Sequence, residues 1–283
     1  MTSVIRINKF DQIISKALIT SIVFLLFLTL LFVNGFGQEN IPAIDSKTQA
    51  AIIDSVSKAL NDIYVFPDVA KNMEKLILKN LKDGKYQKIT NLVEFANQLT
   101  EDLRSVSHDK HLGVRPLPPR DPNTASRPSP EDERKQRIEQ LRNDNFGFKK
   151  IELLPGNIGY IDFRYFADAG FGGAGATAIA AMNFLAHADA IIFDMRQNGG
   201  GSPSMIQLIS SYLFEEPVHL NSFYIRKNDE TRQFWTQGYV EGPKMTDIPV
   251  YILTSSYTFS GAEEFTYNLK NINWFQWVMI HLC

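Results

Sequence analysis

The sequence holds almost no cysteine: the only one among 283 residues is Cys283, at the C-terminus. A disulfide framework or a thiolate metal site within one chain is therefore excluded. The five histidines include one close pair, and no H-E-x-x-H segment occurs, so neither a metal nor another cofactor is expected. The formal net charge of −2 lacks the basic excess of nucleic-acid-binding proteins, so a nucleic-acid partner is not expected.

The first 37 residues have the order of features that is typical of an export signal. Basic residues precede an uncharged apolar run, Ala17–Val33, and the small residues Gly35 and Gly37 follow it. The run is long for a signal and short for a membrane span, so cleavage before Gln38 is expected and an uncleaved anchor is the alternative. We expect residues 1–37 to be a signal peptide and the rest to be periplasmic or extracellular, or membrane-anchored.

Residues 45–115 contain three stretches with apolar residues at helical spacing, which predict a small helical module. The first stretch lies in residues 46–66, the second runs from Pro67 to about Gly84, and the third from about Asn91 to Val106.

Two histidines, His108 and His111, follow the expected end of the third helix. A histidine there can offset the negative end of the helix dipole. It can also act as a general base, because imidazole titrates near neutral pH. The sequence pattern leaves both roles open.

Residues 116–150 are rich in proline and charge, and predict a linker with a short charged helix around Glu131–Arg142. Residues 151–283 alternate strand-like and helix-like segments, which predicts an α/β domain. No strand is assigned in the polar, aromatic stretch that ends at Gly242. The expected strands are Ile158–Phe166, Ala190–Phe193, Leu220–Arg226 and Val250–Leu253, and the expected helices are Ala174–Ala186, Pro203–Leu213 and one from Gly261.

Ser260 lies between the last expected strand and the helix that begins at Gly261. A serine at such a junction is exposed at the sheet edge, beside the free N–H groups of the helix, and can act as a nucleophile. Its alternative role is that of a helix N-cap, with Glu263 completing a capping box.

The segment D-M-R-Q-N-G-G-G, Asp194–Gly201, follows a buried strand and is the second candidate site element. Consecutive glycines let backbone N–H groups approach a substrate closely, as an oxyanion hole requires. A flexible turn is the alternative, in which Asp194 and Arg196 form a structural ion pair.

A third pattern, Gly170-x-Gly172-x-x-Gly175 followed by Asp194 at the end of the next strand, fits a dinucleotide-binding fingerprint. Three residues, 167–169, separate the preceding strand from the first glycine, and an exported protein is not expected to use a nicotinamide cofactor. A nucleotide-binding enzyme is therefore a minor alternative.

Together, DMRQNGGG and TFSGAEEF resemble the tail-specific (C-terminal-processing) serine protease family, and YVFPDVAKNM, GKY and DKHLGV extend the resemblance over about residues 45–271. The branch it resembles has no inserted PDZ domain, includes relatives of the interphotoreceptor retinoid-binding protein, and is similar to the tricorn protease core. The resemblance implies that Ser260 is the nucleophile and His111 the base, with His108 as the fallback. It implies oxyanion donors at Gly199 or Gly200 and at Gly261, and a peptide or protein substrate.

The sequence departs from this family after Asn271, where apolar and aromatic residues crowd without a period. Family members continue there into another strand, a glycine-rich loop and further sheet. The lysine or acidic partner that the family supplies further on has no counterpart here. We therefore expect a truncated or frame-shifted α/β core, an unpaired sheet edge after the last expected strand, and weak or no peptidase activity.

Two function classes follow. The first is a serine-type peptidase that hydrolyses peptide bonds through an acyl-enzyme. The second is a non-catalytic protein of the same superfamily that binds apolar ligands or peptides.

Overall fold

The computed structural model describes residues 43–117, 129–272 and 277–281. The predicted signal peptide lies outside these residues. None of the helices within the described ranges combines the length and apolar character that a membrane span needs. The chain divides into two compact units, and each is described by itself: Met1–Ser57 with Lys71–Pro119, and Lys58–Ala70 with Arg120–Cys283.

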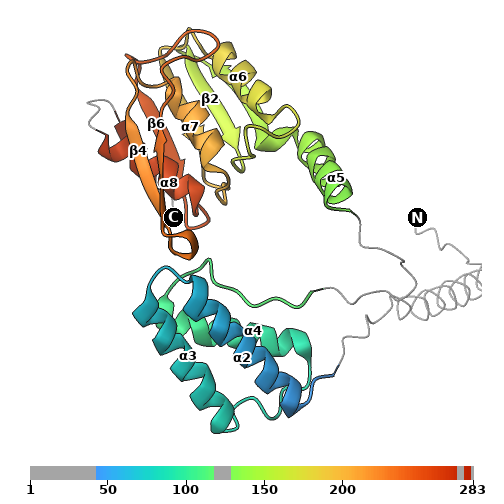
Figure 1. Ribbon diagram of the computed structural model, residues 1–283. Helices are drawn as coiled ribbons and strands as arrows, with labels where there is room; N and C mark the ends of the chain where they lie inside the picture. The colour runs from blue at the N-terminus through green and yellow to red at the C-terminus, as the bar shows by residue number, and fades with distance from the viewer. Residues whose placement is uncertain (1–42, 118–128, 273–276, 282–283) are drawn as a thin grey trace, which may run out of the picture. The chain divides into compact units, whose positions relative to one another are not determined.

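The three helices predicted for residues 45–115 are confirmed as α2 (Ser46–Ile63), α3 (Pro67–Lys82) and α4 (Leu92–Ser107). Figure 1 shows them as neighbouring helices of one bundle. The α4 helix begins where the side chain of Asn91 accepts hydrogen bonds from two backbone N–H groups, an N-cap that fixes its start. Fully buried apolar side chains form the interior of the bundle: Ile53, Met73, Ile77, Phe95 and Leu99.

Asp102 on α4 is a buried charged side chain that joins α4 to the preceding helix and loop. Its carboxylate accepts hydrogen bonds from Tyr86 Oη at 2.6 Å, Lys85 Nζ at 2.7 Å and Asn80 Nδ2 at 2.9 Å. Burial raises the pKa of this carboxyl, but the three hydrogen bonds outweigh it and hold the pKa below the ordinary value.

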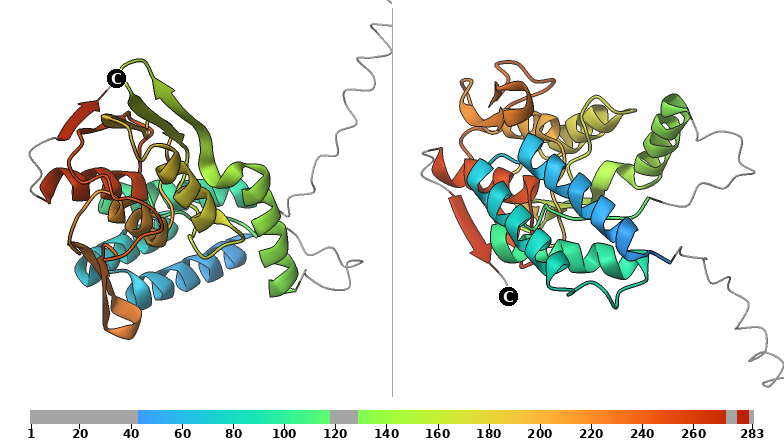
Figure 2. Two further views of the ribbon diagram at one scale, coloured as in Figure 1. Left: turned by 90° about the horizontal axis from the view of Figure 1, so that it is seen from above. Right: turned by 60° about the horizontal axis from the view of Figure 1, so that its bottom comes forward.

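The second unit is built on a five-stranded sheet with strand order β1-β2-β3-β6-β7. The β1–β2 pair is antiparallel, and the β2–β3, β3–β6 and β6–β7 pairs are parallel, so the sheet is mixed as predicted. Helices α6, α7 and α8 lie between the parallel strands in the chain (Figures 1 and 2). The strands are β1 (Phe148–Leu154), β2 (Ile158–Phe163), β3 (Ala190–Asp194), β6 (Val250–Thr254) and β7 (Trp277–His281); the helices are α5 (Pro130–Asn143), α6 (Ala174–Phe184), α7 (Pro203–Ser211) and α8 (Gly261–Asn271), with 3₁₀ turns η2 (Asn145–Gly147) and η3 (Arg226–Asn228).

Alternate residues of the central strands are buried on one face of the sheet, as the period of two in a strand requires. Phe163 of β2 and Phe193 of β3 lie on this face, and Phe193 packs edge-on against Phe265 of α8 at 5.2 Å. This contact places α8, and with it the turn that holds Ser260, on the buried face.

Two predictions need correction: the end of the linker, and the absence of a strand in the polar, aromatic stretch before Gly242. The charged helix is confirmed as α5, but strand β1 begins at Phe148, inside the predicted linker. The stretch before Gly242 contains strand β5 (Glu230–Trp235), which pairs antiparallel with β4 (His219–Ile225). Charged residues at exposed positions mask the strand period in both β1 and β5.

A strand lies after Asn271, where no strand was expected, while the truncation of the α/β core stays a prediction. Strand β7 pairs with β6 in parallel, from Val250 with Trp277 to Thr254 with His281, and forms the edge of the sheet (Figure 2).

Candidate active site

The Ser260 turn joins β6 to α8 in a conformation that few side chains adopt. Ser260 has φ 55° and ψ −121°, the angles of the first central residue of a type II′ turn, which is usually glycine. Such strain costs roughly 1–3 kcal/mol and is concentrated at functional sites. The alternative role is also present, because Ser260 is the N-cap of α8 and its N–H donates to Glu263 Oε2 at 3.0 Å.

The glycine-rich turn lies directly against this serine. A Cβ on Gly200 would come within 2.6 Å of Gly261 N and 2.8 Å of Ser260 Cβ. A Cβ on Gly261 would lie 2.9 Å from Gly201 N. The structure therefore brings together the two sequence elements that the resemblance links, and only glycine permits so close an approach.

Neither of the two predicted donors in the glycine turn has a free N–H group. The N–H of Gly199 donates to the carbonyl of Arg164 at 3.3 Å, and that of Gly200 donates to Asn198 Oδ1 at 2.8 Å. The N–H groups of Gly201 and Gly261 donate to no acceptor within the described parts of the chain. The oxyanion roles of Gly199 and Gly200 thus stay predictions, and Gly201 joins Gly261 as a candidate donor.

Buried Asn198 fixes the shape of the glycine turn. Its Nδ2 donates to the carbonyl of Phe163 at 2.9 Å, while its Oδ1 accepts from Gly200. A buried amide with both ends bonded holds the turn at a set distance from the end of β2.

Three hydrogen bonds fasten the serine loop to the glycine turn. Ser255 Oγ donates to the carbonyl of Arg196 at 2.6 Å, Thr258 Oγ1 to that of Met195 at 2.9 Å, and Phe259 N to that of Asn198 at 3.2 Å. Contacts along the whole loop therefore fix the position of Ser260 relative to the glycine turn.

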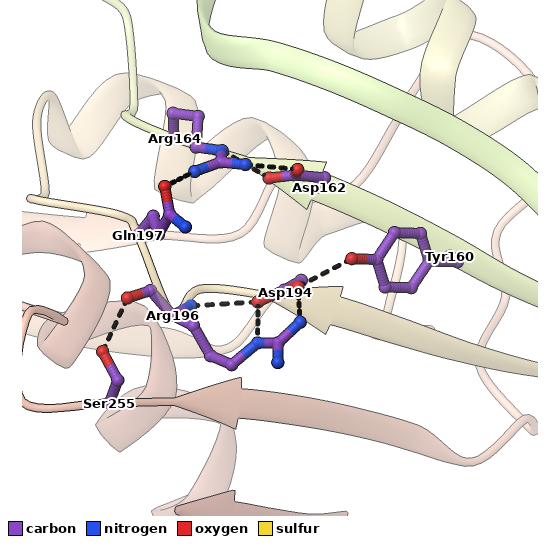
Figure 3. A pocket seen from close by; sticks show the side chains of 7 residues that line it. All are labelled: Tyr160, Asp162, Arg164, Asp194, Arg196, Gln197 and Ser255. Atoms are coloured by element: carbon purple, nitrogen blue, oxygen red, sulfur yellow. Dashed lines mark hydrogen bonds and ion pairs between the residues drawn. The ribbon is translucent and has the colours of Figure 1, made fainter. Parts of the chain in front are cut away.

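The ion pair expected between Asp194 and Arg196 is present, with Nη2 2.6 Å from Oδ2 (Figure 3). Burial raises the pKa of the Asp194 carboxyl, but hydrogen bonds from Arg196 and Tyr160 outweigh it and lower the pKa. Burial and the hydrogen bond to Asp194 raise the pKa of Tyr160 to about 12. Asp194 therefore stays ionised and shapes the turn.

The two histidines lie in the helical unit, and Ser260 lies in the α/β unit. His108 is the C-cap of α4, in a left-handed conformation with φ 54°, which matches its structural alternative. His111 is exposed, and its Nδ1 lies 3.0 Å from Asp109 Oδ1, which also accepts the N–H of His111 at 2.9 Å. The pairing of His111 with Ser260 stays a prediction.

Sequence reasoning missed Asn198 and Gly201 beside Ser260, and it missed Asp109 as the partner of His111. Asp109 stands two positions before His111, a spacing that allows a turn in which the aspartate binds the backbone N–H two residues on. Asn198 precedes three glycines, where an asparagine side chain commonly closes a turn. Both signals were in the sequence.

The glycines of the alternative dinucleotide fingerprint pack against protein atoms. A Cβ on Gly172 would meet Ile138 Cγ2 at 2.3 Å, and one on Gly175 would meet the carbonyl of Ala169 at 2.8 Å. The glycine loop also begins seven residues after β2 ends, whereas the fingerprint turn follows its strand at once. Close packing, and not dinucleotide binding, therefore accounts for glycine at positions 172 and 175.

A serine on a strained strand-to-helix turn, apposed to a second turn with backbone donors, is an arrangement that serine hydrolases on α/β sheets also have. Two family models match the chain: the N-terminal domain of Peptidase_S41 in eukaryotic IRBP over residues 39–151, and peptidase family S41 over residues 157–278. The chain belongs to peptidase family S41, a family of proteases. The second match runs past Asn271, so the expectation that family sequence ends there is wrong.

Three solved structures are similar to the chain. An S41 protease structure from Bacteroides fragilis has 20% identity and a TM-score of 0.41, over 47% of this chain and 38% of that one. The photosystem II D1 C-terminal processing protease has 20% identity and a TM-score of 0.35, over 45% and 32%. A peptidase structure from Parabacteroides merdae has 16% identity and a TM-score of 0.49, over 83% and 75%. The chain thus spans well under half of the first two proteins.

Proposed function

We propose that this chain is a serine-type peptidase in which Ser260 is the nucleophile. The observation that carries the proposal is the backbone conformation of Ser260. Its φ of 55° places the residue on the β6–α8 turn, directly against Gly200. A helix cap alone does not require this strain, because ordinary N-cap residues have extended angles, as Ser202 does at the start of α7 (φ −82°, ψ 133°).

In the proposed reaction, His111 removes the Ser260 hydroxyl proton through Nε2 as Oγ attacks a peptide carbonyl carbon. In this proposal the carboxylate of Asp109 accepts the proton carried on Nδ1 of His111, so that Nε2 is the nitrogen that acts as the base. The N–H groups of Gly261 and Gly201 stabilise the oxyanion. The imidazolium then protonates the amine as the peptide C–N bond breaks, which leaves the acyl-enzyme. His111 next removes a proton from water as its oxygen attacks the acyl carbon, and it returns that proton to Ser260 Oγ as the ester bond breaks.

Turnover of a fluorogenic peptide library tests the proposal. We expect weak hydrolysis by the wild-type protein and its loss in Ser260→Ala, with circular dichroism showing that both variants fold. Hydrolysis of the library by Ser260→Ala at the wild-type rate would contradict the assignment.

We further propose that the protein acts outside the cytoplasm, after export directed by residues 1–37. The order of basic, apolar and small residues in the sequence supports this. N-terminal sequencing of protein expressed with its leader should find Gln38 as the first residue; a retained leader on protein in the cytoplasm would refute export.

A further inference from the structure

A pocket of about 380 Å³ lies at the carboxyl ends of β2, β3 and β6 and has no role in the proposed reaction (Figure 3). In open α/β sheets, ligands bind outside the carboxyl ends of the strands. The size of this pocket is in the range of small-ligand sites. Figure 3 shows its side chains as two acid–arginine rows, with Gln197 at the end of one and Ser255 at the end of the other.

In the row that contains Asp194 and Arg196, every acceptor site of the carboxylate is used. The Asp194 carboxylate accepts from Arg196 N at 3.1 Å, Arg196 Nε at 2.9 Å, Arg196 Nη2 at 2.6 Å and Tyr160 Oη at 2.6 Å. An ionised carboxylate has about four acceptor sites, so Asp194 can bind nothing further. In the other row, Asp162 is paired with Arg164 at 2.6 Å. A cationic guest would therefore meet no unpaired carboxylate.

The free hydrogen-bonding capacity of the pocket is on its donors. Arg196 uses Nε and Nη2 for Asp194, and its Nη1 donates to no acceptor in the described ranges. Gln197 accepts from Arg164 through Oε1, and its Nε2 is likewise without an acceptor in the part of the chain described. The Arg196 side chain is 43% exposed, so a solute reaches it. A guanidinium and an amide donor together match the two oxygens of a carboxylate.

The pocket is connected to the serine by the loop that the glycine turn holds. Ser255 lines the pocket and Ser260 ends the same loop, five residues on. Five residues span at most about 17 Å, which is within the length of a short extended peptide. A peptide with its reacting carbonyl at Ser260 can therefore reach the pocket with a nearby carboxylate.

We propose that this pocket is a specificity subsite that binds a carboxylate of the peptide substrate through Arg196 and Gln197. The inference rests on the proposed function, because it assumes a peptide at Ser260. The carboxylate belongs either to an acidic side chain or to the peptide's C-terminus.

Binding of fluorescein-labelled peptides to Ser260→Ala protein, followed by anisotropy, tests the subsite without turnover. The first arm compares C-terminally amidated libraries that carry Glu or Gln at one position, scanned along the peptide. The second arm compares free-acid with amidated libraries that lack Asp and Glu. We expect about a tenfold preference for the carboxylate form in one arm, which identifies its source.

A charge change at Gln197, an exposed side chain, should alter that preference in a predictable sense. Gln197→Glu should abolish the preference, and Gln197→Lys should keep or increase it. The control Gln237→Glu adds the same charge at another exposed position and should leave the preference unchanged.

Equal binding of carboxylate and neutral libraries in both arms, including no binding of either, would overturn the subsite. So would a preference that Gln197→Glu and Gln237→Glu lower equally. Fluorophosphonate labelling of wild-type protein is run in parallel: labelled protein without a carboxylate preference rejects the subsite alone, whereas unlabelled protein rejects the proposed function.

Discussion

Gly200 and Ser260 approach so closely that a methyl group at Gly200 would lie 2.8 Å from Ser260 Cβ. The same methyl would lie 2.7 Å from the Phe259 carbonyl, and the φ of Gly200 is +98°. The glycine turn and the serine turn thus form one packed unit.

Gly200→Ala should displace Ser260 and abolish its reaction with a fluorophosphonate, because both contacts and the positive φ oppose a side chain. The matched control is Gly199→Ala, whose added methyl would meet nothing closer than Tyr257 Cε1 at 3.9 Å. We expect the control to lose far less labelling, measured as the rate of probe incorporation. Equal losses in both variants would show that the close approach is unimportant.

Ser260→Gly should be more stable than Ser260→Ala by about 1 kcal/mol, because glycine adopts the angles of residue 260 without strain. Urea denaturation of the two variants gives the difference in the free energy of unfolding. Equal stabilities would mean that the β6–α8 turn relaxes to an ordinary N-cap conformation once the hydroxyl is removed.

Asp109→Asn should lower kcat/KM by at least about tenfold, because an amide no longer fixes the proton on Nδ1 of His111. Asp109→Glu should restore part of the rate. A kcat/KM of Asp109→Asn equal to that of the wild-type protein would contradict this role of Asp109.

The stability of the helical unit should fall in acid because of Asp102. The pKa of its carboxyl is below the ordinary 3.8 in the folded state, so the unfolded chain binds its proton first as pH falls. The stabilisation is complete well above pH 3.8 and is lost as pH falls through the folded pKa.

Asp102→Asn should therefore remove part of the difference in unfolding free energy between pH 6 and pH 3, and cost roughly 1–3 kcal/mol at pH 6. Chemical denaturation at the two pH values measures both effects. The exposed Asp62→Asn on α2 serves as a control that should change neither. A variant with the full wild-type acid sensitivity would refute the role of Asp102.

The sequence was sufficient to predict the helices and strands that have a clear pattern of apolar residues. Apolar stripes predicted α2, α3 and α4, and the buried run at Val250 predicted β6 almost to the residue. The charged strands β1 and β5 were missed because their partners, and not their own residues, make them strands. The edge strand β7 was missed because an apolar run without a period does not distinguish a strand from a buried helical segment.

The candidate site also has some features that the sequence predicts and others that depend on the folded chain. The sequence indicated Ser260, the glycine turn and the Asp194–Arg196 pair, since each follows a strand end. Which glycine N–H groups are free depends on where Asn198 and the Arg164 carbonyl lie, and that is a property of the folded chain. The spacing of Asp109 and His111 allows a contact between them, but only the folded loop shows that the carboxylate lies beside Nδ1.

The nucleophilic character of Ser260 is tested most directly by fluorophosphonate labelling followed by mass spectrometry of the peptide that contains it. The account predicts one added phosphonyl group on Ser260 in folded wild-type protein, none after denaturation, and none in Ser260→Ala. A folded wild-type protein that stays unlabelled, or equal labelling of Ser260→Ala, would contradict it.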